Sequence, residues 1–158
     1  MGFRILFVCL GNICRSPAAE AIALRLQPEF PAISRIDSAG IGNWHVGDPP
    51  DPRMIDAAGA FGLDLTPLRG RQVERSDFDE FDLIVGMDSE NVADLKDLRP
   101  VGSRAQVVPM SRWTGCDVPD PYTGGRAGFD RVLTMLSAGV RAMFEELSAS
   151  AEGTEGRR

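Results

Sequence analysis

Short apolar runs alternate with segments of helical periodicity along the 158-residue chain. Four segments are predicted strands: residues 5–8 and 83–87 are continuous apolar runs typical of buried strands, residues 34–39 are a weaker strand, and residues 105–108 are the fourth. The last long segment repeats apolar residues at helical spacing, which predicts an amphipathic helix. Its apolar stripe comprises Phe129, Val132, Leu133, Leu136, Val140, Met143, Phe144 and Leu147.

Cap residues indicate where the other helices begin. Ser16 is placed to cap a helix over residues 17–27, and Ser76 to cap a short helix that ends near Phe81. Asp51 precedes a third helix and Asp88 a fourth. The inward positions are Met54, Ile55, Ala58 and Phe61 in the third helix and Val92, Leu95 and Leu98 in the fourth.

Doubly buried strands that alternate with helices form parallel sheets with right-handed crossovers. The sequence therefore predicts a single α/β domain over residues 1–148, followed by a flexible tail over residues 149–158. An irregular stretch, residues 109–128, separates the last strand from the last helix. Ligands of such sheets bind beyond the carboxyl ends of the strands, so functional residues are expected in the loops there.

Composition narrows the range of functions. The net charge of −6 and the isoelectric point near 4.8 argue against nucleic acid as a partner. The apolar runs are too short for membrane insertion, and the first residues lack the apolar region of a secretory signal. Three cysteines, two of them in one loop, do not suit a disulfide framework and favour a cytoplasmic location. With His45 as the single histidine, no zinc site of usual spacing can be assembled.

The first strand leads into a loop with the features of an anion site. Its sequence is Cys9-Leu10-Gly11-Asn12-Ile13-Cys14-Arg15, followed by Ser16-Pro17. Gly11 and Asn12 tolerate a positive φ, so successive backbone N–H groups can point inward. The helix that follows directs its N-terminal dipole at the same point. A Cys-x5-Arg match alone is weak, but this context favours a phosphate-sized anion above a thiol.

The side chains of the loop fit the steps of phosphoryl transfer. Cys9 is the candidate nucleophile, because a helix N-terminus, inward amides and an arginine lower the pKa of a thiol from about 8.5. Arg15 is the candidate phosphate ligand, since its planar fork grips two oxygens. The amides of residues 10–15 would bind further oxygens, and the Ser16 hydroxyl could donate to the thiolate. The alternative interpretation of Cys9 is a small buried residue at a strand end.

Displacement of an alcohol or phenol also requires a general acid. Asp120 is one candidate, because the prolines on both sides of it restrict its backbone. Asp117 is the competing candidate. An Asp-Pro turn without a catalytic role is as consistent with the local sequence as either acid.

Two aromatic residues are candidates for the entrance of the site. Trp44 lies in a glycine-flanked loop, and Tyr122 follows the Asp-Pro pair. Exposed aromatic residues in loops often mark contact surfaces, although Trp44 folded over the edge of the core is an equal alternative. We interpret the neighbouring His45 as a solvated loop residue, and the charged run of residues 69–75 in the same way.

These motifs together resemble the low-molecular-weight protein tyrosine phosphatases over residues 5–147. The resemblance rests on Val8 to Pro17, Asp37-Ser38-Ala39-Gly40, Trp44, Asp51-Pro52-Arg53, Met87-Asp88 and Asp120-Pro121-Tyr122. It implies a four-stranded parallel sheet in the order 2-1-3-4 with helices on both faces, and no metal or organic cofactor. It also implies hydrolysis of phosphotyrosine in proteins, and of aryl phosphates, through a phosphocysteine on Cys9. Asp120, rather than Asp117, would be the acid and then the base.

The same resemblance assigns the binding residues. The substrate-binding positions are Leu10, Gly11, Asn12, Ile13, Cys14, Ser16, Trp44 and Tyr122, of which Leu10, Trp44 and Tyr122 would wall a phenyl ring. Asn12 would hold the strained turn, with Ser38 among its supports. Such a deep site selects phosphotyrosine over phosphoserine. The resemblance further implies inhibition by phosphate and other oxyanions, a monomer with weak self-association as the alternative, and a protective disulfide between Cys9 and Cys14.

Two positions depart from the family pattern, and two rival functions share part of it. Thr123 stands where many relatives have a second tyrosine, and Leu68 where many have a histidine that supports the phosphate loop. An arsenate reductase of the same fold would share the Cys9 loop, but it needs further cysteines after the third strand, where this chain has none. A catalytically silent phosphotyrosine-binding module is disfavoured by the presence of Cys9, Arg15 and Asp120.

Overall fold

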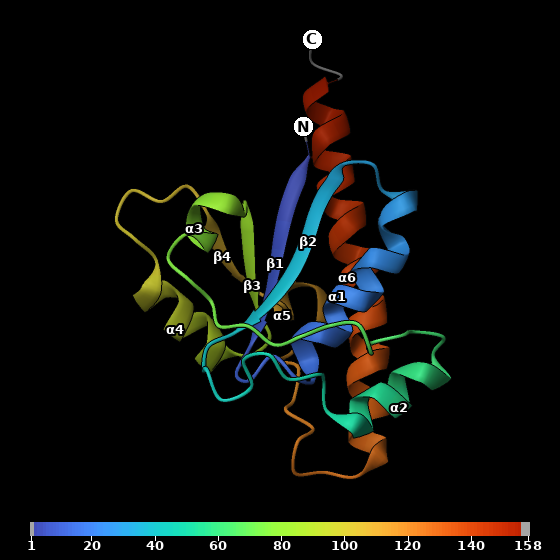
Figure 1. Ribbon diagram of the computed structural model, residues 1–158. Coiled ribbons are helices and arrows are strands. Elements are labelled where there is room, and N and C mark those ends of the chain that lie inside the picture. Colours follow the sequence, from blue (N-terminus) through green and yellow to red (C-terminus); the bar gives the residue numbers. More distant parts are fainter. Residues whose placement is uncertain (1, 156–158) are drawn as a thin grey trace.

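The four predicted strands pair side by side in one parallel sheet (Figure 1). The structure, a computed structural model, describes residues 2–155. The strands are β1 (Phe3–Cys9), β2 (Ile33–Gly40), β3 (Leu83–Gly86) and β4 (Gln106–Pro109). Their order is β2-β1-β3-β4, so the predicted fold class and strand order are confirmed.

The carboxyl end of β1 lies where the strand connections diverge. From β1 the chain crosses to β2 on one side, and then to β3 on the other side. In the register, Cys9 lies opposite Gly40 and Val8 lies opposite Gly86. The loops that follow these three strands therefore meet at one edge of the sheet, where ligands bind in this architecture.

Helices lie on both sides of the sheet, as predicted (Figure 1). One side carries α1 (Arg15–Leu26), α2 (Pro52–Ala60), α5 (Ser111–Thr114) and the long α6 (Arg126–Glu155). The other side carries α3 (Asp77–Glu80) and α4 (Ser89–Leu98), and a 3-10 turn, Gln27–Glu29, follows α1. None of the helices in residues 2–155 is long and apolar enough to cross a membrane.

Alternation along β1 divides the apolar core into two clusters. Ile5 and Phe7 pack with α1 and α6, whereas Leu6 and Val8 pack with α3 and α4. All four side chains are fully buried, as expected for a strand with an unbroken apolar run. The loop after β1 is thus anchored in both clusters of the core.

Two helices begin at the predicted caps. The Asp51 carboxylate accepts a hydrogen bond from the backbone N–H of Arg53 at the start of α2. The Asp88 carboxylate accepts one from the backbone N–H of Asn91 at the start of α4. Each bond satisfies one of the N–H groups that a helix start leaves without a partner.

Other predicted ends and faces differ from the structure. Ser16 lies inside the first turn of α1 and does not cap it, and Ser76 precedes α3 without a side-chain capping bond. Leu98 is half exposed at the last residue of α4, and the predicted inward face does not extend to it. The helix α6 continues to Glu155, past the predicted start of the tail at residue 149, and residues 156–158 of that tail lie outside the described residues.

Candidate active site

Residues 10–14 form a tight loop between β1 and α1. Asn12 has a φ of 58°, and among the described residues it alone has a positive φ without being glycine. Such a backbone costs about 1–2 kcal/mol, although asparagine tolerates it better than most residues. Gly40 permits the close packing of this turn, because a Cβ there would lie 3.0 Å from the carbonyl carbon of Gly11. The loop is therefore compact enough for its backbone to surround a small anion.

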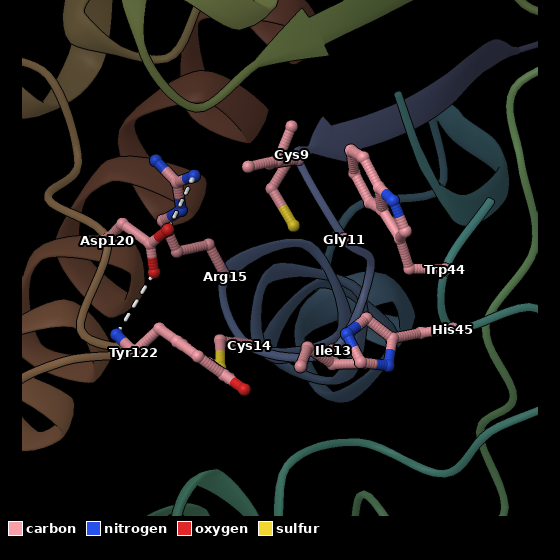
Figure 2. Close-up of a pocket in the computed structure, with 10 residues that line it drawn as sticks. Cys9, Gly11, Ile13, Cys14, Arg15, Trp44, His45, Asp120 and Tyr122 are labelled. Atoms are coloured by element: carbon pink, nitrogen blue, oxygen red, sulfur yellow. Dashed lines mark hydrogen bonds and ion pairs between the residues drawn. The ribbon is translucent and has the colours of Figure 1, made fainter. Parts of the chain in front are cut away.

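The Cys9 sulfur lies at the floor of a pocket enclosed by this loop (Figure 2). Only 3% of the residue is exposed. Ser16 Oγ lies 3.0 Å from Cys9 Sγ, within hydrogen-bonding distance for sulfur. This contact explains why the capping prediction for Ser16 is wrong: its hydroxyl faces the sulfur instead of a backbone N–H group.

Asn12 connects the loop to β2 and to the segment before α3. Its Nδ2 donates to Ser16 Oγ at 2.8 Å and to Ser38 Oγ at 3.0 Å. Its Oδ1 accepts from the backbone N–H of Arg71 at 3.0 Å. Because Asn12 occupies an acceptor site of the Ser16 hydroxyl, the hydroxyl hydrogen is free to donate, and its two acceptors are the Cys9 sulfur at 3.0 Å and the Ala39 carbonyl at 3.4 Å.

Two ionisable groups lie behind this network. Ser38 donates to Glu20 at 2.5 Å, and burial raises the pKa of Glu20 against the opposing effect of that hydrogen bond. Arg71 pairs with Asp37 at 3.1 Å and with Asp77 at 3.0 Å. The interpretation of the charged run as a solvated loop holds for the exposed Arg69, Glu74 and Arg75, but it is wrong for Arg71, whose guanidinium ties β2 to the first turn of α3.

The Arg15 guanidinium forms the back of the pocket. Its Nη1 donates to Asp88 Oδ2 at 2.6 Å and to the carbonyl of Val118 at 2.9 Å. Its Nη2 lies 3.9 Å from Asp120 Oδ2, and the residue as a whole is 2% exposed. Nε and Nη2 make no hydrogen bond to a described residue, so they are available to an oxyanion.

The structure separates the two candidate acids. Asp120 lines the pocket, and its Oδ1 accepts from the backbone N–H of Tyr122 at 3.0 Å. Asp117 instead accepts from the hydroxyl and the backbone N–H of Ser89 at the start of α4. These two bonds lower the pKa of Asp117. Of the two carboxylates, Asp120 is the one placed to meet a ligand.

Aromatic side chains form opposite walls of the pocket, whose volume is about 200 Å³. Figure 2 shows Trp44 and His45 on one side and Asp120 and Tyr122 on the other, with the Cys9 sulfur between them. Trp44 is 67% exposed and Tyr122 is 52% exposed, so Trp44 does not fold over the edge of the core. The lining residues are Cys9, Leu10, Gly11, Ile13, Cys14, Arg15, Trp44, His45, Asp120 and Tyr122.

His45 is a lining residue that the sequence did not single out. A Cβ on Gly11 would lie 3.2 Å from His45 Cδ2, so the imidazole packs against the loop of residues 10–14. The His45 ring nitrogen Nδ1 also lies 3.2 Å from Asp48 Oδ2. His45 is thus a loop residue whose side chain is 33% exposed, as expected, but its imidazole also lines the pocket, and its place next to Trp44 was the available signal.

Cys14 and the two positions that depart from the family pattern, Leu68 and Thr123, have the following surroundings. Cys14 lines the pocket as a free thiol, and burial raises its pKa, with a further increase from the charge of Asp51. Leu68 packs against the apolar core, and Thr123 is exposed. In the part of the chain that the structure describes, no three His, Cys, Asp or Glu side chains are arranged to hold a metal ion.

A thiol at the floor, an arginine fork behind it and a carboxylate at the rim define a cysteine-dependent hydrolase of phosphoric esters. The family model for low molecular weight phosphotyrosine protein phosphatases matches residues 4–152. The chain belongs to this family, and it is a protein-tyrosine phosphatase.

Relatives and solved structures agree with this assignment. The low molecular weight phosphotyrosine protein phosphatase of Schizosaccharomyces pombe is 42% identical over 80% of this chain and 85% of the relative. The low molecular weight protein-tyrosine-phosphatase YfkJ of Bacillus subtilis is 38% identical over 92% of this chain and 94% of the relative. The crystal structure of a protein tyrosine phosphatase from Entamoeba histolytica has a TM-score of 0.87 and 34% identity, covering 95% of this chain and 99% of that one.

Proposed function

We propose that Cys9 is the nucleophile, Arg15 the phosphate ligand, and Asp120 the general acid and then base of phosphotyrosine hydrolysis. One observation carries this proposal: the Cys9 sulfur lies at the floor of a pocket that has Arg15 behind it and Asp120 at its rim. With this arrangement, the Cys9 sulfur can attack phosphorus from the floor of the pocket, and the alcohol can leave on the opposite side, where Asp120 lies.

In the first step, the Cys9 thiolate attacks phosphorus and an S–P bond forms. The P–O bond to the phenol breaks, and Asp120 gives its proton to the departing oxygen. The Arg15 fork and the backbone N–H groups of residues 10–15 bind the equatorial oxygens, where negative charge concentrates. The protein then carries a phosphocysteine, and Asp120 is left as a carboxylate.

In the second step, Asp120 takes a proton from water, and the water oxygen attacks phosphorus. The S–P bond breaks, its electron pair returns to sulfur, and inorganic phosphate is released. Ser16 Oγ, at 3.0 Å, donates a hydrogen bond to the departing thiolate. The resting thiolate and the protonated carboxyl are thereby restored.

The walls of the pocket favour a flat aromatic ester. Leu10, Trp44 and Tyr122 present apolar surface above the phosphate loop, and a phenyl ring fits between the two aromatic side chains. A phosphoserine is too short to fill this space while its phosphorus reaches Cys9. Ile13 adds to the apolar lining of the pocket.

A structural neighbour raises phosphoarginine as a competing substrate. That neighbour is described as a Drosophila arginine phosphatase, with a TM-score of 0.84 and 29% identity to this chain. A guanidino group carries several polar N–H groups, and the apolar side chains of Leu10, Ile13 and Trp44 leave part of them without partners, which disfavours it here. We therefore assign phosphotyrosine in proteins as the substrate class.

The cysteines and the loop also suggest a cellular location, inhibitors and a form of redox regulation. Cys9 and Cys14 are free thiols, which suits a reducing cytoplasm. Phosphate and other oxyanions are expected to inhibit by occupying the loop. We expect a monomer with at most weak self-association, and formation of a Cys9–Cys14 disulfide after peroxide treatment.

Hydrolysis of an aryl phosphate tests the proposal. Cys9→Ser should abolish turnover, while Asp120→Ala should slow turnover by about 10²- to 10⁴-fold and keep substrate binding. Wild-type rates in Cys9→Ser would overturn the mechanism. Arsenate-dependent thiol oxidation, measured in parallel, would indicate a reductase, and preferred hydrolysis of phosphoarginine would indicate the other substrate class.

A further inference from the structure

The Arg53 guanidinium lies between two aromatic rings beside the active site. Its Cζ is 5.3 Å from the centre of the Tyr122 ring and 4.9 Å from the centre of the Phe129 ring. Both distances are within the range of cation–π attraction. A cation in the first turn of a helix is unfavourable because of the helix dipole, so Arg53, at the start of α2, requires compensation by its neighbours.

On one side, Arg53 is anchored to the phosphate loop through Asp51. Its Nε donates to Asp51 Oδ1 at 3.1 Å, and its Nη2 donates to Asp51 Oδ2 at 2.8 Å. Asp51 is 7% exposed, and its pKa is lowered chiefly by these side-chain bonds. The backbone N–H of Asp51 donates to the carbonyl of Ile13 at 2.9 Å. The bidentate pair therefore fixes Arg53 relative to the loop that surrounds the phosphate site.

On the other side, Arg53 contacts the segment that carries Asp120. The backbone N–H of Tyr122 donates to Asp120 Oδ1 at 3.0 Å, so the Asp120 carboxylate is bonded to the backbone of the residue whose ring Arg53 contacts. Residues 119–124, all of them described, form no hydrogen bond with a residue outside that segment. Their tethers are the buried Pro121, the 3.9 Å ion pair from Arg15 to Asp120, and the Arg53 guanidinium on Tyr122.

We propose that Arg53 is a positioning residue that couples the phosphate loop to the Asp120–Tyr122 segment. By holding the Tyr122 ring, Arg53 sets the wall against which the substrate ring packs and, through the shared backbone, the position of the Asp120 carboxyl. This inference rests on the proposed function, because it assigns Tyr122 as a wall and Asp120 as the acid. It makes Arg53 a determinant of selectivity for aryl esters without direct contact with the reacting atoms.

A double-mutant cycle tests this coupling. Arg53→Met, Tyr122→Leu and the double variant are compared for kcat/KM with a phosphotyrosine peptide and for the inhibition constant of inorganic phosphate. Arg53→Met should lower kcat/KM about two- to fivefold, the size of an exposed cation–π contact. The double variant should be no worse than Tyr122→Leu alone. The inhibition constant of phosphate should stay within about twofold of wild type, because phosphate contacts only the loop.

Arg112→Met is the matched control. Arg112 also pairs with a carboxylate, Glu146 at 2.7 Å, and lies 5.5 Å from the centre of an aromatic ring, that of Trp113. It borders a groove with Phe3 and Asp82 at the amino ends of β1 and β3, away from the active site. Its kcat/KM should equal that of wild type.

Three results would overturn the inference. A loss on Arg53→Met that persists undiminished in the Tyr122→Leu background would show that Arg53 does not act through the ring. A parallel rise in the inhibition constant of phosphate would show general damage to the loop, and an unchanged kcat/KM would show no role. Cys9→Ser is assayed alongside. If the proposed function is wrong, this variant should keep turnover; if only the role of Arg53 is wrong, it should have none.

Discussion

Ser16 Oγ lies 3.0 Å from Cys9 Sγ, although the start of α1 would otherwise use a serine as a helix cap. The hydroxyl oxygen accepts a hydrogen bond from Asn12 Nδ2 at 2.8 Å, which leaves its hydrogen to the sulfur or to the more distant Ala39 carbonyl at 3.4 Å. A hydrogen bond to a charged group contributes about 1.5–3 kcal/mol. In the proposed mechanism, negative charge returns to the sulfur when the S–P bond breaks, so we expect this hydrogen bond to act in the breakdown of the phosphocysteine.

Ser16→Ala removes that donor and leaves the rest of the loop in place. Because each 1.4 kcal/mol corresponds to a factor of ten, we expect kcat for an aryl phosphate to fall by about 10- to 100-fold. A burst of phenol in stopped-flow measurements should remain, since the first step is less affected than the second. Ser34→Ala, which removes an exposed hydroxyl that donates to the carbonyl of Phe3, should leave kcat unchanged. Equal values of kcat in the two variants would refute the role of Ser16.

The leaving-group dependence of kcat/KM tests Asp120 against Asp117. In Asp120→Asn, the loss should be larger for phenyl phosphate than for p-nitrophenyl phosphate, because the more basic phenolate needs the proton more. Asp117→Asn keeps an acceptor oxygen but removes the charge that strengthens the bonds from Ser89 at the start of α4, so it should lower the melting temperature slightly, with little effect on the leaving-group dependence. The reverse pattern would assign the acid to Asp117.

Asn12 combines a strained backbone with three hydrogen bonds. Asn12→Gly loses the side-chain hydrogen bonds but relieves the backbone strain. Asn12→Ala loses the same hydrogen bonds and keeps the strain. We expect urea unfolding to give Asn12→Ala a free energy of unfolding about 0.5–1 kcal/mol below that of Asn12→Gly. Both variants should have a lower kcat than wild type, because Ser16 loses its orienting donor. An alanine variant as stable as the glycine variant would mean that the loop relaxes out of the left-handed conformation.

The raised pKa of Glu20 predicts a pH dependence of stability. A carboxyl whose pKa is higher in the folded protein contributes stability below its ordinary pKa, 4.5, and this contribution is lost as the pH rises through the folded value. Asp37 adds to the effect of burial, while Ser38 and Arg71 oppose it. The free energy of unfolding of wild type should therefore fall relative to that of Glu20→Gln as the pH is raised from about 4.5 to 8.

Urea titrations at several pH values measure that difference. The exposed Glu90→Gln is the control, and it should track wild type at every pH. Parallel pH profiles for wild type and Glu20→Gln would show that Glu20 ionises in the folded protein as it does in the unfolded chain.

Features with a local physical cause were predictable from the sequence. The unbroken apolar run before Cys9 specifies a doubly buried strand, and Asp51 and Asp88 cap the helices that follow them. The same holds for the apolar stripe of α6, which is buried along its length from Phe129 to Leu147. Periodicity and caps act over a few residues, so they can be recognised without the tertiary structure.

Roles that depend on distant partners were not predictable in this way. Arg71 pairs with Asp37, which is 34 positions away in the sequence, and nothing in the charged run around Arg71 indicates that partner. Ser16 is a preferred cap residue and is followed by a proline, yet a thiol brought close by the turn at Asn12 competes for its hydroxyl. His45 joins the pocket wall because Gly11 has no side chain to exclude it. In each case tertiary contacts override the local preference.

Direct detection of the phosphoenzyme tests the central claim, that the Cys9 sulfur accepts the phosphoryl group. Asp120→Ala is mixed with p-nitrophenyl phosphate, quenched in acid within milliseconds, digested and analysed by mass spectrometry, because loss of the base slows hydrolysis of the intermediate. The account predicts phosphate on the peptide that contains Cys9, in an amount close to one per active site, and none in the Cys9→Ser, Asp120→Ala double variant. Phosphate on any other residue, or in equal amount in that double variant, would contradict it.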